Sequence, residues 1–227
     1  PDEVLEREIM NHLFPDTTYG CESGGDPKNI PDLTYENFLN FHRTYYHPSN
    51  SYIYLYGNMD MEEKLAFLDE HYLSHFDYLD VDSVIQEQKE FGACRDVTLE
   101  YPVAENEGEE DNTYLSYNMV VGNAADSQMA MAFEVLDYAL LSAPGAPLKQ
   151  ALLDVKAGKD VYGSYDDGIL QPYFTVIAKG SNPDRKEEFV SVIRQVLGDI
   201  VKNGIDKKAV EAGINYFEFR YREADFS

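Results

Sequence analysis

The order of strand-like and helix-like patterns in residues 96–227 constrains the fold more than any other feature. Runs rich in β-branched and aromatic residues indicate strands, and apolar residues at helical spacing indicate amphipathic helices. The strand patterns cover residues 96–103, 113–122, 159–167 and 170–180, and the helical patterns cover residues 126–142, 147–155, 182–204 and 206–226. Strand pairs that alternate with helix pairs predict an α+β fold, with helices packed on one face of an antiparallel sheet.

The first 78 residues contain three helical patterns but only one strand pattern. The helical patterns cover residues 2–14, 34–46 and 60–76, with Thr34 and Asp60 as N-caps. Residues 51–58 (SYIYLYGN) have the composition of a strand, and both of its faces are apolar, which predicts burial on both sides. One strand is too little sheet to stand alone, so this part is predicted to be the end of an incomplete α+β unit.

Composition changes between these two parts of the chain. Residues 79–95 are polar and acidic, and we interpret them as a linker between residues 1–78 and a domain at 96–227. Within that domain, residues 105–111 (ENEGEED) interrupt the first two strand patterns. We expect them to form a solvated hairpin tip.

Charge and cysteine content exclude several classes of function. The formal net charge is −24, of which residues 1–82 carry −13, so binding to nucleic acid phosphates is disfavoured. No apolar run is long enough for a membrane span, and the first residues lack the pattern of a signal peptide. Cys21 and Cys94 lie far apart in the sequence and indicate reduced thiols rather than a disulfide framework.

The best candidate for a metal site is the pair His71 and His75. A spacing of four residues places both side chains on one face of a helix, as a pair of zinc ligands requires. A metallopeptidase helix of this type also carries a glutamate beside the second histidine, and here that position is Ser74. No third ligand lies nearby, so the pair is interpreted as two polar positions at the end of a helix.

Three other candidates are weaker. Cys21 could be a nucleophile with His12 as its base, but nothing in the sequence brings them together. Residues 23–27 (SGGDP) lack the Lys-Ser/Thr of a phosphate-binding loop and predict a turn with positive φ. The scattered carboxylates define no acid–base pair and are expected on turns and helix ends: Asp166 and Asp167, Glu62 and Glu63, and Glu109 to Asp111. The sequence thus contains no complete catalytic constellation, and no substrate-binding residue is assigned.

Two stretches of this sequence nevertheless resemble a known enzyme family. Residues 13–38 (LFPDTTYGCESGGDPKNIPDLTYENF) and 46–58 (YHPSNSYIYLYGN) resemble the pitrilysin/insulinase family of zinc metallopeptidases, in the subfamily of the mitochondrial presequence protease. The second half is similar too, through residues 135–152 (VLDYALLSAPGAPLKQAL) and the helix that ends in VKNGID. The similarity covers essentially the whole chain, although none of these motifs is catalytic.

The resemblance implies a specific architecture. Members of the family have four similar α+β domains of the mitochondrial processing peptidase type, arranged around a closed chamber. Zinc is held by an inverted His-x-x-Glu-His helix and a later glutamate in the first domain, and neither matches a position here. Residues 1–78 would then be the C-terminal part of the first, catalytic domain without its zinc motif, and residues 96–227 most of the second, non-catalytic domain. The chain would begin just after the last zinc ligand.

The resemblance also implies a function for the longer parent protein. The parent would be a zinc metalloendopeptidase that degrades unstructured peptides, and this segment would form part of its chamber wall without being catalytic. The partners expected are peptide substrates, with a preference for basic ones because of the acidic first part, and the remaining domains of the parent. A non-native dimer of this segment is also expected, because its missing neighbours would leave apolar surface uncovered.

An alternative from a different class is a catalytically inactive binding or scaffold protein with the same fold. The full gene discriminates the two, since an upstream inverted zinc motif would support the peptidase. The bacterial cytoplasm is the expected location, with the mitochondrial matrix as the alternative.

Overall fold

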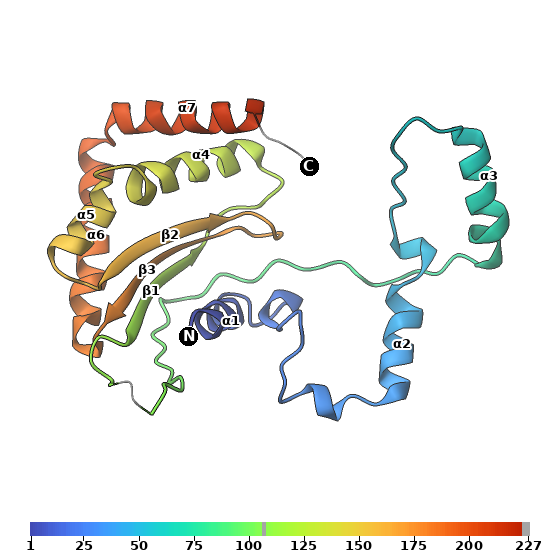
Figure 1. Ribbon diagram of the computed structural model, residues 1–227, viewed down its shortest axis with the longest axis horizontal. Helices are drawn as coiled ribbons and strands as arrows, with labels where there is room; N and C mark the ends of the chain where they lie inside the picture. Colours follow the sequence, from blue (N-terminus) through green and yellow to red (C-terminus); the bar gives the residue numbers. More distant parts are fainter. Residues whose placement is uncertain (106–107, 224–227) are drawn as a thin grey trace. The chain divides into compact units, whose positions relative to one another are not determined.

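The computed structural model describes residues 1–105 and 108–223, which belong to two compact units (Figure 1). The first, here called the sheet unit, comprises Pro1–Cys21 and Glu87–Ser227. The second, here called the helical unit, comprises Glu22–Gln86. Residues 1–21 therefore pack with the second half of the chain, whereas the division of the parent into domains at residues 78 and 96 stays a prediction.

The sheet unit is built on three antiparallel strands, β1 (Thr113–Val120), β2 (Asp160–Asp166) and β3 (Tyr173–Ser181). Their order is β1-β3-β2, so β3 is central and pairs with both neighbours. Val176 of β3 lies opposite Tyr117 of β1 and Gly163 of β2. Because side chains alternate along a strand, this register places Phe174, Val176 and Ala178 on one face of the sheet.

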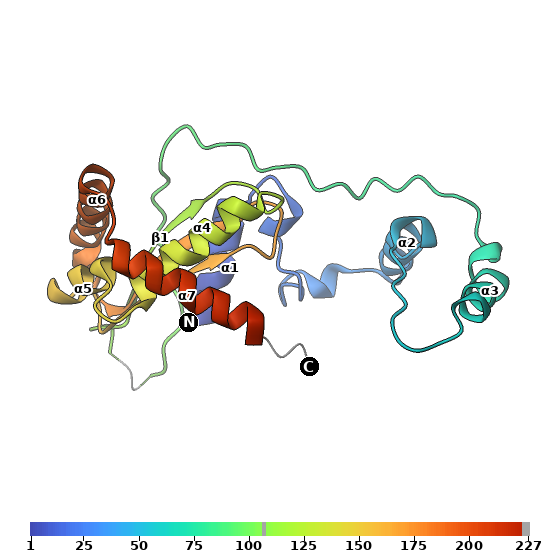
Figure 2. The same ribbon diagram turned by 90° about the horizontal axis from the view of Figure 1, so that it is seen from above.

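That face is covered by helices that follow β1 in the chain (Figures 1 and 2). They are α4 (Ser127–Asp137), which continues as a π-helical turn at Tyr138–Ser142, α5 (Pro147–Asp154), α6 (Lys186–Asn203) and α7 (Lys207–Glu223). The core between sheet and helices includes Leu141, Leu148, Leu152, Val161, Val176, Phe189 and Ile193, all almost completely buried. The α+β fold class predicted from the sequence is thereby confirmed, including the antiparallel sheet and its covering helices.

Helix α1 (Asp2–Leu13) packs against the opposite face of the same sheet. Ile9, Leu13 and Phe14 form a second apolar cluster with Val120 and Tyr173 at its border. Phe14 is completely buried, and its ring meets the ring of Tyr173 edge-on at 6.1 Å between centroids. The sheet unit therefore has a helix on each side, whereas the sequence pattern of residues 96–227 predicts cover on one side only.

Local signals account for the ends of these helices. The Asp126 carboxylate accepts a hydrogen bond from the Met129 N–H at 3.0 Å and caps α4, while Pro147 occupies the first turn of α5. Helix α6 ends at Gly204, whose φ of 86° is a conformation that glycine adopts without steric cost. The positions of Pro147 and Gly204 confirm the helix start and the helix end predicted from the sequence, whereas the Asp126 cap is an additional finding of the structure.

The helical unit contains α2 (Tyr35–Tyr45) and α3 (Met61–His71). The Thr34 hydroxyl accepts from the Asn37 N–H, and the Asp60 carboxylate accepts from the Glu63 N–H, both at 3.1 Å. Short 3₁₀ turns at Ile30–Asp32, Pro48–Asn50 and Leu73–His75 complete the unit. Both predicted caps are confirmed, but neither helix buries any of its residues.

Two predicted strands are absent from the described structure. Residues 51–58 and 96–103 lie outside every strand of the sheet, so their assignment as paired strands is wrong for this chain. The physical reason is the same for both, because a strand exists only through hydrogen bonds to a neighbouring strand. The expected hairpin tip at 105–111 falls partly outside the described residues, since 106 and 107 are not described.

Candidate functional site

The two histidines proposed as zinc ligands do not share a helix face. Helix α3 ends at His71, and His75 lies in the following 3₁₀ turn. The His71 ring packs against Phe67 at 4.6 Å between centroids, and the His75 side chain is exposed. Among residues 1–105 and 108–223, no group of three or more His, Cys, Asp or Glu side chains is placed to hold a metal ion. The donor set of the described residues does not fit a zinc site.

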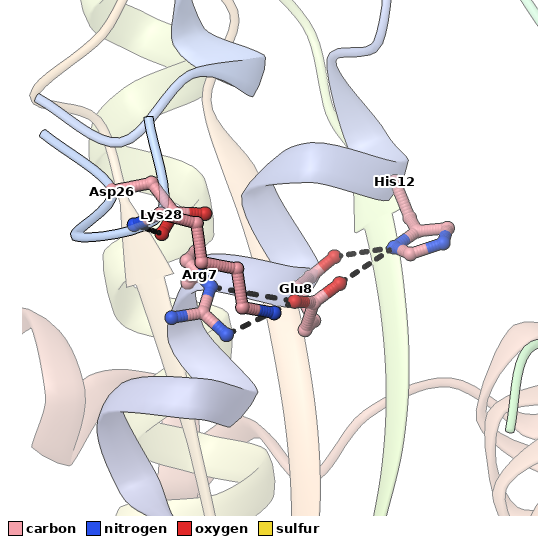
Figure 3. Close-up of polar contacts among 5 residues, drawn as sticks. All are labelled: Arg7, Glu8, His12, Asp26 and Lys28. Atoms are coloured by element: carbon pink, nitrogen blue, oxygen red, sulfur yellow. Dashed lines mark hydrogen bonds and ion pairs between the residues drawn. The ribbon is translucent and has the colours of Figure 1, made fainter. Parts of the chain in front are cut away.

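The proposed Cys21–His12 pair is not formed either. Cys21 is exposed, and in the described part of the chain its thiol makes no hydrogen bond. The His12 Nδ1 lies 2.8 Å from the carbonyl oxygen of Glu8, one turn earlier in α1, and 3.8 Å from its carboxylate (Figure 3). Arg7 Nη2 forms an ion pair with the same carboxylate, at 3.3 Å from Glu8 Oε1. His12 therefore belongs to a helix-surface network and has no contact with a nucleophile.

The glycine pair in SGGDP forms a turn, as predicted. Gly25 has φ of 86°, and its N–H donates to the Glu22 carbonyl at 3.1 Å. The Asp26 carboxylate then accepts from the Lys28 N–H at 2.9 Å, which starts the next bend. The acidic side chain is thus engaged with the backbone, and the loop has the geometry of a chain reversal.

Two of the scattered carboxylates, Asp166 and Asp111, have structural partners. Asp166 accepts from the Gly168 N–H at 2.9 Å and from the Tyr173 hydroxyl at 3.2 Å. Burial raises the pKa of Tyr173 to about 12, and the Asp166 charge adds to the effect. Hydrogen bonds from Asn182 and Lys159 lower the pKa of Asp111 below its usual value. These contacts stabilise turns and strand ends, and they do not form an acid–base pair.

Asp137 is an ionisable residue that the sequence analysis missed. It ends α4, and the Ser142 hydroxyl donates to its Oδ2 at 3.3 Å while its buried Oδ1 has no hydrogen-bond partner. Burial raises the pKa of Asp137 to about 6. The signal in the sequence is a single acid inside the apolar run FEVLDYALL, which predicts a carboxylate facing a dry environment.

The most prominent feature of the helical unit is its exposed aromatic surface. We use this name for the large apolar side chains of residues 33–78 that are more than 40% exposed: Leu33, Tyr35, Phe38, Phe41, Tyr46, Tyr52, Ile53, Tyr54, Tyr56, Leu65, Phe67, Tyr72, Phe76 and Tyr78. Phe38 and Phe41 are 65% and 59% exposed, and Tyr52 is fully exposed. A shallow hollow of about 340 Å³ on this surface is lined by Tyr45, Tyr46, His47 and Tyr72, among others. Apolar exposure on this scale is typical of an interaction surface.

No described helix is both long and apolar enough to cross a lipid bilayer. The aromatic residues of the helical unit are separated by polar and charged ones, as in the sequences of α2 and α3. This alternation is typical of surfaces that pack against other protein segments.

A family model and several known proteins are similar to this chain. A model of the peptidase M16 inactive domain matches residues 32–217. Protein HypA of Clostridium perfringens is 47% identical over 226 residues, which cover 100% of this chain and 23% of that protein. Presequence protease 1, chloroplastic/mitochondrial, of Arabidopsis thaliana is 36% identical over 227 residues, which cover 98% of this chain and 21% of that protein. The mitochondrial presequence protease of Xenopus laevis is 30% identical over 231 residues, which cover 100% of this chain and 22% of that protein.

The chain therefore spans about a fifth of the length of these curated relatives. Among solved structures, an M16-like peptidase from Alicyclobacillus acidocaldarius is similar with a TM-score of 0.59 at 18% sequence identity. The similarity covers 97% of this chain and 51% of that one. At this level of identity the likeness shows the fold alone.

Proposed function

Because the chain belongs to the peptidase M16 inactive-domain family, we propose that it is a non-catalytic segment of a longer zinc metalloendopeptidase. The parent degrades unstructured peptides inside a closed chamber, and this segment forms part of the chamber wall. Residues 1–78 correspond to the end of the first, catalytic domain, residues 79–95 to a linker, and residues 96–227 to the second domain.

The exposed aromatic surface is the observation that carries this proposal. Helices α2 and α3 bury none of their residues in this chain, although both present large apolar side chains. An amphipathic helix is stabilised by the packing of its apolar face, so a covering partner is required. The relatives are four to five times as long as this chain, which supports a partner within the same polypeptide.

The zinc ion of the parent is proposed to bind outside this chain. Among the described residues, no third His, Cys, Asp or Glu lies close enough to bind a metal ion together with His71 and His75. The two histidines also lie in different elements, since His71 ends α3 and His75 is in the following 3₁₀ turn. The contribution of the described residues to the reaction is to enclose and position peptide.

The charge of the chain supports a preference for basic peptides. Residues 1–82 carry a net charge of −13, and an acidic wall concentrates cations in an enclosed volume. In the parent, cleavage of a Lys/Arg-rich peptide should slow as salt is raised, relative to a neutral peptide of equal length. Equal salt dependence for the two peptides would remove the basis for this preference.

The proposed function is tested by comparing the parent with residues 1–227 alone. Zinc content is measured by elemental analysis, and peptidase activity with a quenched fluorescent peptide. We expect about one zinc per chain and cleavage in the parent, and neither in residues 1–227. Zinc and cleavage in residues 1–227 would contradict the non-catalytic role, whereas their absence from both proteins would favour a binding or scaffold protein.

We propose the bacterial cytoplasm as the location, with the mitochondrial matrix as the alternative; the 47% identity to a Clostridium perfringens protein supports a bacterial source, and the mitochondrial relatives support the mitochondrion. Fractionation of cells that express the parent from its own gene distinguishes these locations.

A further inference from the structure

The polar segment 79–95, whose composition predicts a linker, is held by hydrogen bonds near both of its ends. At its start, the Leu79 N–H donates to the Ser49 hydroxyl at 3.1 Å. The Ser83 hydroxyl donates to the Asn50 side-chain oxygen at 2.6 Å. The first residues of the segment are therefore fixed to the helical unit, to which they belong.

Gln88 fixes the same segment to the sheet unit. Its side chain is buried, with 6% of the residue exposed. The Gln88 Oε1 accepts from the Asp16 N–H at 2.9 Å, and its Nε2 donates to the Asp16 carboxylate at 2.7 Å. The Gln171 side chain forms a similar pair with the Gln88 backbone, accepting from its N–H at 2.6 Å and donating to its C=O at 3.3 Å. We call Asp16, Gln88 and Gln171 the Gln88 clamp, in which buried amide groups are paired as burial requires.

The Gln88 clamp also holds the first connection between the two units. Asp16 lies in the loop after α1, shortly before the sheet unit ends at Cys21. In the same loop, the Tyr19 hydroxyl accepts from the Leu170 N–H at 3.2 Å. Because Asp16 is bonded to Gln88, the two chain segments that leave the sheet unit for the helical unit are fixed to each other.

Val84, Ile85 and Gln86 lie between the two sets of attachments. In the part of the chain that the structure describes, no backbone or side-chain group of these three residues takes part in a hydrogen bond. Val84 is 73% exposed, and Gln86 is exposed as well. A segment with few buried contacts and no hydrogen bonds is deformed at little cost.

We propose that the Gln88 clamp confines the bending of this connection to residues 84–86, which form a short hinge in place of the whole segment 79–95. Bending after the hinge breaks the bonds of Gln88 and leaves buried polar groups unpaired, which is costly. Bending before the hinge breaks the bond between Ser83 and Asn50, whereas bending within residues 84–86 breaks none. The clamp also explains why a glutamine is buried in an otherwise exposed, acidic segment.

Amide hydrogen exchange in residues 1–227 tests the hinge directly. The amides of residues 84–86 should exchange at nearly the rate of an unstructured peptide, and those of Asp16 and Gln88 about a hundredfold more slowly. Fast exchange at Asp16 and Gln88 would overturn the clamp. Protection of residues 84–86 equal to that of Gln88 would overturn the hinge.

Two glutamines of this segment provide a matched pair of variants. Gln88→Ala removes the acceptor of the Asp16 N–H, so exchange of the Asp16 amide should rise about tenfold. Gln86→Ala lies in the proposed hinge and removes no hydrogen bond of the described chain, so it should leave that amide unchanged. Equal effects of the two variants at Asp16 would contradict the inference.

Exchange in the central strand β3 shows whether the sheet unit stays folded in these variants. The clamp lies outside both apolar clusters, so the amides of β3 should exchange equally in Gln88→Ala and Gln86→Ala. A rise in β3 as large as the rise at Asp16 would mean that Gln88 supports the whole unit, and would also overturn the inference.

Limited proteolysis of residues 1–227 measures the same attachment through the backbone. Trypsin cleaves after Lys89, whose carbonyl accepts from the Gln88 Nε2 at 3.3 Å. Cleavage after Lys89 should be about tenfold faster in Gln88→Ala than in Gln86→Ala or the unmodified chain. Equal rates in the three proteins would contradict the inference. None of these measurements involves zinc or the cleavage of a peptide substrate, so their outcome is separable from that of the proposed function.

Discussion

At the scale of single residues, Asp137 shows how the helix layer changes the chemistry of a side chain. Its Oδ1 is buried without a hydrogen-bond partner, and burial raises its pKa to about 6. An aspartate whose pKa is raised by folding destabilises the native state at neutral pH. The unfolded chain ionises first as pH rises from about 4, so stability falls until the folded carboxyl also ionises near pH 6.

We therefore predict that Asp137→Asn stabilises the sheet unit at pH 8. The pKa shift corresponds to about 3 kcal/mol, which we reduce to roughly 1–2 kcal/mol because the side chain is only partly buried. The advantage over the unmodified protein should fall by about half at pH 5, where the carboxyl is mostly protonated in the folded state. Urea denaturation at pH 8 and pH 5 measures the difference in the free energy of unfolding between the variant and the unmodified protein.

Asp167→Asn is the control, because Asp167 is exposed and its substitution removes the same charge. It should have little effect on stability at either pH. Equal stabilisation by the two variants would show that total charge, and not the burial of Asp137, is responsible.

At the scale of elements, the contact between β2 and the π-helical turn depends on the absence of a side chain at Gly163. A Cβ added there would overlap both Leu141 Cδ1 and the carbonyl oxygen of Thr175. Leu141 is almost completely buried, and Thr175 lies on the central strand, so neither can move aside easily. The close approach of helix layer and sheet thus requires glycine.

Gly163→Ala should accordingly destabilise the sheet unit by about 2–3 kcal/mol through overpacking. Gly198→Ala is its counterpart in the middle of α6, where a Cβ would meet nothing within 4 Å. It should stabilise the protein by up to about 1 kcal/mol, because alanine is the better helix former. Thermal and urea unfolding of both variants measure the difference, and a neutral Gly163→Ala would refute the packing argument.

The helices of the two units differ in how much they depend on their caps. Helix α2 packs against neither apolar cluster, so only local interactions stabilise it within residues 1–227, whereas α4 packs on the sheet through partly buried residues such as Phe133. Loss of an N-cap costs about 1 kcal/mol in either helix. Thr34→Ala should therefore lower the helix population of α2, while Asp126→Ala leaves α4 fully formed.

Cα chemical shifts of the Thr34→Ala and Asp126→Ala variants of residues 1–227 measure the helix populations of α2 and α4. A loss of helical shifts in α4 equal to that in α2 would mean that packing on the sheet does not support α4.

At the scale of the whole molecule, the two units differ in how completely they bury their apolar side chains. The sheet unit has continuous apolar clusters on both faces of its sheet. The helical unit has none among its described residues, and its aromatic side chains are exposed. The first unit can thus be stabilised by its own packing, whereas the second depends on a partner.

Residues 1–227 alone should therefore bind an apolar fluorescent dye and self-associate, mainly through the helical unit. Phe38→Ser should reduce dye fluorescence and the fraction of dimer in sedimentation more than Phe219→Ser does. Both phenylalanines are 65% exposed, but Phe219 lies in α7 of the sheet unit. Equal reductions would show that the exposed aromatic surface has no special role.

Features that depend on neighbours in the sequence were predictable. The Thr34 and Asp60 hydrogen bonds, the Gly25 turn and the end of α6 at Gly204 each involve residues a few positions apart. The pattern of strands and helices from residue 113 onward was also sufficient for the fold class. For the candidate site, the sequence correctly predicted a structural turn at SGGDP but missed Asp137, whose pKa depends on burial.

Features that depend on distant partners required the tertiary structure. Residues 51–58 and 96–103 have strand composition but no strand partner in the described chain, because pairing comes from a neighbour that composition cannot supply. The position of α1 on the second face of the sheet depends on Phe14 meeting Tyr173, more than 150 residues away. Local hydrogen bonds and periodicity are encoded within a few residues, whereas pairing and burial are properties of the assembled chain.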